Sequence, residues 1–283
     1  MKSSLSRAAA FMLSTVCLAG LAGRVRAEES VPALGRKVFA ANKDSLVKVT
    51  GVAQIRFSAA ARPGLSLPER EDKVRADGTL VDDKGLVVLS LSAIDPSRLV
   101  DGREVNSPNG PLKVEASATL KELEIILGDG TEIPATVVFK DEDLDLAFLR
   151  PRADAPEAKG VAFDPVDLAT AGTVQVADYT VSVTRLEELF NNDPAMMPGQ
   201  VSAVIERPRP FVLSTNVVRG CPMFTLDGRL VGIGIVRHRR TEGGAAAGNA
   251  LVPAAELVKL VRQIPEKASA AGPSAADGPT ATP

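Results

Sequence analysis

The sequence has few of the residues that usually cross-link or metallate small exported domains. It contains two cysteines and one histidine. Cys17 lies in a segment that we expect to be removed, so Cys221 remains as the single thiol and an intramolecular disulfide is excluded. The lone histidine, His238, gives no paired metal-ligand spacing, and the chain has no phosphate-binding loop and no GxSxG motif. We therefore predict neither a metal site nor a cofactor.

Residues 1–27 have the pattern of a signal peptide. Lys2 and Arg7 give a basic start, residues 8–22 are apolar, and Val25-Arg26-Ala27 places small residues at the cleavage positions. The apolar run is too short for a confident membrane span. We predict cleavage near Ala27 and export to the periplasm or the cell exterior, with membrane attachment only where the signal segment stays uncleaved.

The exported chain lacks an excess of positive charge. The whole sequence has 33 Lys and Arg against 35 Asp and Glu, and four of the basic residues precede Ala27. Without them, 29 basic residues face the same 35 acidic ones, a net charge of −6. This balance argues against nucleic acid as a general partner.

Short alternating segments separated by polar turns dominate the rest of the chain and predict antiparallel strands. We expect strands at 46–49, 52–57, 78–81, 86–91, 123–127, 133–139, 146–149, 174–183, 200–205, 211–215, 223–224 and 230–236. The expected helices span 31–43 and 253–264, the expected surface loops 58–77, 95–110 and 189–199, and the expected disordered tail 265–283.

A linker rich in proline and small residues, 153–172, divides an N-terminal unit (28–152, with the leading helix) from a C-terminal one (173–264). Many short strands on both sides of one linker predict an all-β protein of two antiparallel β-barrels with a C-terminal helix.

The most informative stretch runs from Gly220 to Ile233. Met223 and Phe224 lead into Leu226-Asp227-Gly228, where Asp-Gly supplies the positive φ angles of a tight turn before the return strand 230–236. This stretch resembles trypsin-like serine proteases of the HtrA (Deg) type, in which Ser-Gly-Gly-Pro-Leu is followed by a Leu-Asp-Gly turn and a Val-Ile-Gly-Ile strand. Here the corresponding start is Arg219-Gly220-Cys221-Pro222.

Other segments resemble the same family in the same order, from about Leu34 to Ile264. They are Gly85–Leu89 before the family's catalytic histidine, Asp143–Leu149 around its aspartate, Gly199–Ala203, and Leu251–Pro253 before the last helix. The resemblance implies a trypsin-like double barrel, here without a following PDZ domain.

The resemblance also places the family's triad on Ser92, Asp145 and Arg219. A serine hydroxyl is no base near pH 7, and an arginine is a permanent cation rather than a nucleophile. Only Asn216-Val217-Val218 separates Thr215 from Arg219, so we expect the turn that aims the oxyanion donors to be missing. No catalytic triad is intact on this alignment.

Three other features have alternative explanations. Cys221 is the candidate alternative nucleophile, with His238 as its formal partner, although a cysteine beside proline is more often a buried hydrophobe and His238 is expected in a solvated loop. Asp141, Asp143 and Asp145 have the spacing of a calcium loop but lack its glycine and glutamate. Met196-Met197-Pro198 is either an adaptable binding lip or a cover for the barrel.

Two function classes follow. The first is a pseudoprotease, an exported module that binds an extended peptide or an envelope protein by strand addition. The second is a serine-type or Cys221-based endopeptidase with unorthodox catalytic residues.

Overall fold

The computed structural model describes residues 29–59, 68–107, 110–241 and 244–264. The predicted signal peptide and tail lie outside these ranges. In the described part of the chain, no helix is both long and apolar enough to cross a membrane.

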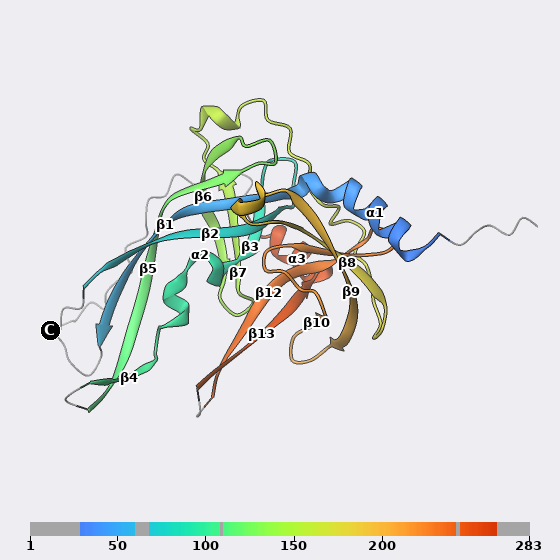
Figure 1. Ribbon diagram of the computed structural model, residues 1–283. Coiled ribbons are helices and arrows are strands. Elements are labelled where there is room, and N and C mark those ends of the chain that lie inside the picture. The colour runs from blue at the N-terminus through green and yellow to red at the C-terminus, as the bar shows by residue number, and fades with distance from the viewer. Residues whose placement is uncertain (1–28, 60–67, 108–109, 242–243, 265–283) are drawn as a thin grey trace, which may run out of the picture.

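The first half of the chain forms an antiparallel barrel (Figure 1). Its strands are β1 (Leu46–Ala59), β2 (Arg70–Leu80), β3 (Val87–Ser90), β4 (Glu104–Ser107), β5 (Gly110–Ile126), β6 (Glu132–Asp141) and β7 (Leu146–Pro151). They follow the order β1-β2-β3-β7-β6-β5-β4, and pairing of β1 with β5 closes six of them into the barrel.

The second half forms another closed barrel, in the order β10-β13-β12-β11-β8-β9. Its strands are β8 (Tyr179–Arg185), β9 (Pro194–Ile205), β10 (Phe211–Ser214), β11 (Pro222–Thr225), β12 (Leu230–Thr241) and β13 (Gly244–Pro253). The prediction of an all-β double barrel is confirmed.

Helices are few. They are α1 (Val31–Asn42), α2 (Leu91–Ile94), α3 (Ala254–Val261) and the short 3-10 turns Lys43–Ser45, Pro96–Leu99, Pro156–Ala158 and Glu188–Phe190. Helix α1 packs on β8 and β9 of the second barrel, and α3 packs on β12 and β13. Both flanking helices were predicted from the apolar periodicity.

The apolar residues sort into barrel interiors and a layer between barrels. Val87 and Leu89 of β3 belong to the interior of the first barrel, whereas Leu86 and Val88 belong to a cluster shared with the second barrel and α3. Successive side chains of a strand point to opposite faces, so burial of both faces explains why 86–89 is uniformly apolar. The barrels are therefore packed against each other through this layer.

Several predicted loops are wrong. Strand β2 begins at Arg70 and so takes up residues 70–77 of the expected loop 58–77. Charged residues surround the inward-facing Val74 and Ala76 there and hide the alternating pattern. Strand β4 lies within the expected loop 95–110, and β9 begins at Pro194, inside the expected loop 189–199.

Other boundaries also differ. The two strands expected on either side of Gly51 are one strand, β1, with a register shift at that point, and β8 begins at Tyr179 rather than 174. The backbone of His238 lies in β12, paired with Ala247 of β13, not in a loop. Small residues with low strand propensity form β13, which is why the sequence pattern did not reveal it. In Figure 1 the β12–β13 hairpin and the outer part of β5 with β4 extend below the barrels.

Candidate functional site

Asp145 and Ser92 meet at the side of the first barrel that faces the second. Asp145 has a positive φ of 56° in the turn before β7 and is 4% exposed, and Ser92 lies in α2 directly after β3. The Ser92 amide donates to Asp145 Oδ1 at 2.8 Å, and the Ser92 hydroxyl donates to Oδ2 at 3.1 Å. The Ser92 hydroxyl is thus a hydrogen-bond donor to this carboxylate.

Two further donors complete the shell of Asp145. The Ser90 hydroxyl donates to Oδ2 at 2.5 Å, and the amide of Val236 on β12 donates to the same oxygen at 3.3 Å. A buried carboxylate needs such donors, since an unsatisfied one is costly. Ser90 was missed in the sequence, although its position two residues before Ser92 puts both hydroxyls within 3.2 Å.

Arg219 lies on the short segment between β10 and β11 and is exposed. Its backbone forms an isolated parallel bridge with Gly234 of β12. Arg219 and Ser92 line the same pocket, of about 440 Å³. The structure therefore links the three positions that the resemblance assigns to the triad: Ser92 is hydrogen-bonded to Asp145 and lines one pocket together with Arg219.

Gly220 fixes this segment against the first barrel. It has a φ of +75°, and a Cβ on it would lie 1.9 Å from the Asp77 carbonyl oxygen. The Thr79 hydroxyl donates to the Gly220 carbonyl at 2.8 Å, and the Gly220 amide donates to the Gly234 carbonyl at 2.8 Å. Only glycine allows this approach, so the place of Arg219 is set from both barrels.

Cys221 is sealed between the barrels. It is 0% exposed and its thiol donates to the Thr184 hydroxyl at 3.4 Å. Burial raises the pKa of the Cys221 thiol far above its ordinary range. The thiolate is the reactive form, so both facts favour a buried hydrophobe over a nucleophile.

Asp141, Asp143 and Asp145 each have a different hydrogen-bond or ion-pair partner. Asp141 accepts the Leu144 amide at 2.9 Å, Asp143 pairs with Arg209 at 3.0 Å, and Asp145 accepts the serine hydroxyls. Among the described residues, no cluster of three or more His, Cys, Asp or Glu could hold a metal ion.

A buried ion pair beside Cys221 was also missed. Lys48 Nζ of β1 lies 2.7 Å from Asp77 Oδ1 of β2, and Lys48 also donates to the Arg185 carbonyl at 3.3 Å. Burial lowers the pKa of Arg185, whose guanidinium donates to the Leu46 carbonyl. A lysine within the apolar run 46–49 was the one signal in the sequence.

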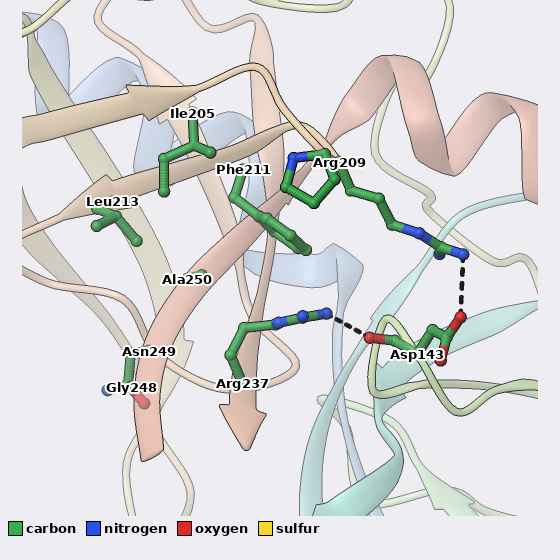
Figure 2. Close-up of a pocket in the computed structure, with 10 residues that line it drawn as sticks. Asp143, Ile205, Arg209, Phe211, Leu213, Arg237, Gly248, Asn249 and Ala250 are labelled. Carbon is green, nitrogen blue, oxygen red and sulfur yellow. Dashed lines mark hydrogen bonds and ion pairs between the residues drawn. The ribbon is translucent and has the colours of Figure 1, made fainter. Parts of the chain in front are cut away.

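A second pocket, of about 670 Å³, lies beside β12 (Figure 2). Ile205, Phe211 and Leu213 form its apolar wall. The guanidinium carbon of Arg237 lies 4.7 Å from the centre of the Phe211 ring, and Arg237 also donates to the Asp143 carbonyl. An extended ligand along β12 could place a side chain here.

The edge of β12 that faces away from β13 has no described strand beside it beyond Gly234, although its Val236 amide is bonded to Asp145. Strand β11 pairs with β12 between Leu230 and Ile233, and Arg219 bridges Gly234. Past Gly234, no described strand pairs with this edge. The Val236 amide points to it, so by strand alternation the backbone N–H and C=O of His238 and Arg240 face it too.

Two six-stranded antiparallel barrels with a pocket between them are the architecture of trypsin-like folds. A family model described as the trypsin-like peptidase domain matches residues 76–233, which include Ser92, Asp145 and Arg219. The chain belongs to this family. No curated protein matches it.

Proposed function

We propose that this protein is a non-catalytic, HtrA-like member of the trypsin-like peptidase family that binds an extended peptide or a segment of an envelope protein. The observation that carries the proposal is the hydrogen bond from the Ser92 hydroxyl to Asp145. The group that meets the aspartate is thus a serine hydroxyl, which has no atom that takes up a proton near pH 7 as the imidazole of a triad does. Arg219, which the resemblance puts at the nucleophile position, is a cation.

Binding is supported by the edge of β12 that faces away from β13. Unpaired N–H and C=O groups of an edge strand are a template for an added strand. The pocket of Phe211 and Arg237 lies beside this edge and offers an apolar wall for one ligand side chain. We further propose that the protein acts outside the cytoplasm, after removal of residues 1–27.

The absence of catalysis and the binding of peptides are tested separately. Purified protein should release no product from casein or fluorogenic peptides, and immobilised randomised peptides should retain it. Substituting His238→Pro removes a backbone N–H that faces this edge and should abolish retention, whereas His238→Ala keeps the N–H and should preserve it. Equal retention by both variants, or turnover by the wild type, contradicts the proposal.

The endopeptidase alternative makes the opposite prediction. It requires turnover that is lost in Arg219→Ala or Cys221→Ala. The complete burial of Cys221 argues against the thiol version.

Localisation has its own test. Fractionation of cells that express the whole chain should place the protein outside the cytoplasm and shortened at its N-terminus. A full-length cytoplasmic protein would contradict the proposed export.

A further inference from the structure

The pocket at the triad-equivalent positions is strongly basic. Its lining contains the basic residues Arg70, Lys73, Arg75 and Arg219 and one acidic residue, Asp72. Asp145 lies beneath Ser92, 4% exposed and occupied by its four donors. A ligand that enters this pocket therefore meets mainly positive charge.

Two of the four cations are already compensated. Arg70 pairs with Asp72 at 2.5 Å, and Arg75 pairs with Glu188. Lys73 and Arg219 are both exposed, and neither has an ion-pair partner within the part of the chain that the structure describes. These two side chains are available to an anion.

Strand geometry explains why the cations gather there. Val74 and Ala76 of β2 point into the first barrel, so Lys73 and Arg75 point outward, on the same face as Asp77. The Asp77 backbone contacts Gly220, the residue after Arg219. The outward face of β2 thus leads along the second barrel to Arg219.

The edge of β12 proposed for strand addition also leads toward Arg219. Strand β12 runs from Leu230 to Thr241, and Arg219 bridges Gly234 on the edge in question. The Val236 amide on this edge is bonded to Asp145, so the edge has no described backbone partner beyond Val236. A peptide added antiparallel to β12 runs from the Arg240 end toward the Gly234 end. Its carboxyl-terminal end would therefore arrive beside Val236, two residues from the position that Arg219 bridges.

We propose that the Arg219 pocket binds a carboxylate at the carboxyl-terminal end of the peptide held by β12, with Lys73 as the second cation. The carboxylate is either the C-terminus itself or an acidic side chain near it, because both offer the two oxygens that a guanidinium binds. This inference rests on the proposed strand addition and specifies the ligand class that it selects.

The direct test compares randomised peptide pools that differ only at the C-terminus. One pool has a free carboxylate, a second is amidated, and a third is amidated with glutamate as its last residue. Wild type should bind the first or third pool about tenfold or more tightly than the second, since a hydrogen-bonded charge pair gives this order of discrimination. Preference for the first pool alone identifies a C-terminus, and preference for the third an acidic side chain.

The variant Arg219→Gln should lose this preference and bind all pools as wild type binds the amidated one. Lys73→Gln should lose part of it. The matched control is Arg262→Gln, which removes an exposed charge near the end of α3 and should retain the preference. Added salt should weaken only the preferred pool.

Failure of this inference differs from failure of the proposed function. Equal affinity of wild type for the three pools would overturn the carboxylate site but not strand addition. The same holds for an equal loss of affinity for every pool in Arg219→Gln. When no pool binds, N-acetylglutamate is added to the protein and the NMR resonance of the Arg219 side chain is followed. A shift of this resonance would support the carboxylate site and refute peptide binding. No shift would refute both.

Discussion

The ammonium of Lys48 lies 2.7 Å from Asp77 Oδ1 between the two barrels, and the two side chains are 6% and 17% exposed. The pair joins β1 to β2 directly beneath the segment that carries Arg219, since Asp77 also contacts Gly220. Each charge compensates the other, because either one alone would be left without a partner where the two barrels meet.

Lys48→Met should lower the free energy of unfolding by about 3 kcal/mol, the usual cost of removing one partner of a buried pair. The double variant Lys48→Met, Asp77→Asn should recover most of this loss. Lys43→Met, which breaks the exposed pair with Asp44, is the control and should cost less than about 0.5 kcal/mol. Urea unfolding of the four proteins measures these values, and equal losses for Lys48→Met and Lys43→Met would show that the buried pair is solvated.

The pH dependence of stability should reveal Asp77. Burial raises the pKa of Asp77 above its ordinary 3.8, and the attraction of Lys48 lowers it by less. The folded protein then holds the proton more tightly than the unfolded chain, so this stabilisation is complete below pH 3.8 and is lost as the pH rises through the folded-state pKa. The difference in unfolding free energy between Asp77→Asn and wild type should shift in favour of the variant as the pH rises through that window, and it should be constant below the window. A relative loss with rising pH would mean that Lys48 outweighs burial.

Gly220 and Gly228 offer a matched pair of substitutions. Both have a positive φ, +75° and +87°, but a Cβ on Gly220 would clash with the Asp77 carbonyl and one on Gly228 would meet nothing within 4 Å. Gly228→Ala should therefore cost about 1 kcal/mol from backbone strain alone. Gly220→Ala should cost at least about 3 kcal/mol, because the two barrels must move apart. Thermal unfolding checks both, and similar costs would contradict the close contact.

The outline of the fold followed from the sequence because strand spacing and the Asp227-Gly228 turn are local signals. Asp145 and Arg219 could be singled out in the sequence because each lies in a short segment that resembles the family. The Lys48–Asp77 pair, the Ser90–Asp145 bond and the Phe211–Arg237 contact were missed because each joins two different segments, and no local sequence pattern reveals such a contact. Strand β13 was missed because it owes its place to pairing with β12 rather than to its own Ala-rich sequence.

Cys221 should be inert in the native protein. Burial and the raised thiol pKa predict negligible labelling by iodoacetamide up to about pH 9 and full labelling in urea. Any preparation that retains the leader needs Cys17→Ser, so that only one thiol is counted. Rapid native labelling would show that the barrel interface opens and would revive the thiol alternative.

Restoring the triad residues should not restore hydrolysis. Ser92→His with Arg219→Ser would set a base and a nucleophile beside Asp145, whose acceptor oxygens already face Ser92. The approach to position 219 still has only Asn216-Val217-Val218, so we expect the oxyanion donors to stay misplaced, and losing one donor alone costs on the order of a hundredfold in rate. The double variant and both single variants should hydrolyse a fluorogenic peptide no faster than wild type, with circular dichroism confirming that each is folded. Rapid hydrolysis by the double variant alone would show that the short approach still aims its donors, and that loss of the base and the nucleophile was the whole reason for inactivity.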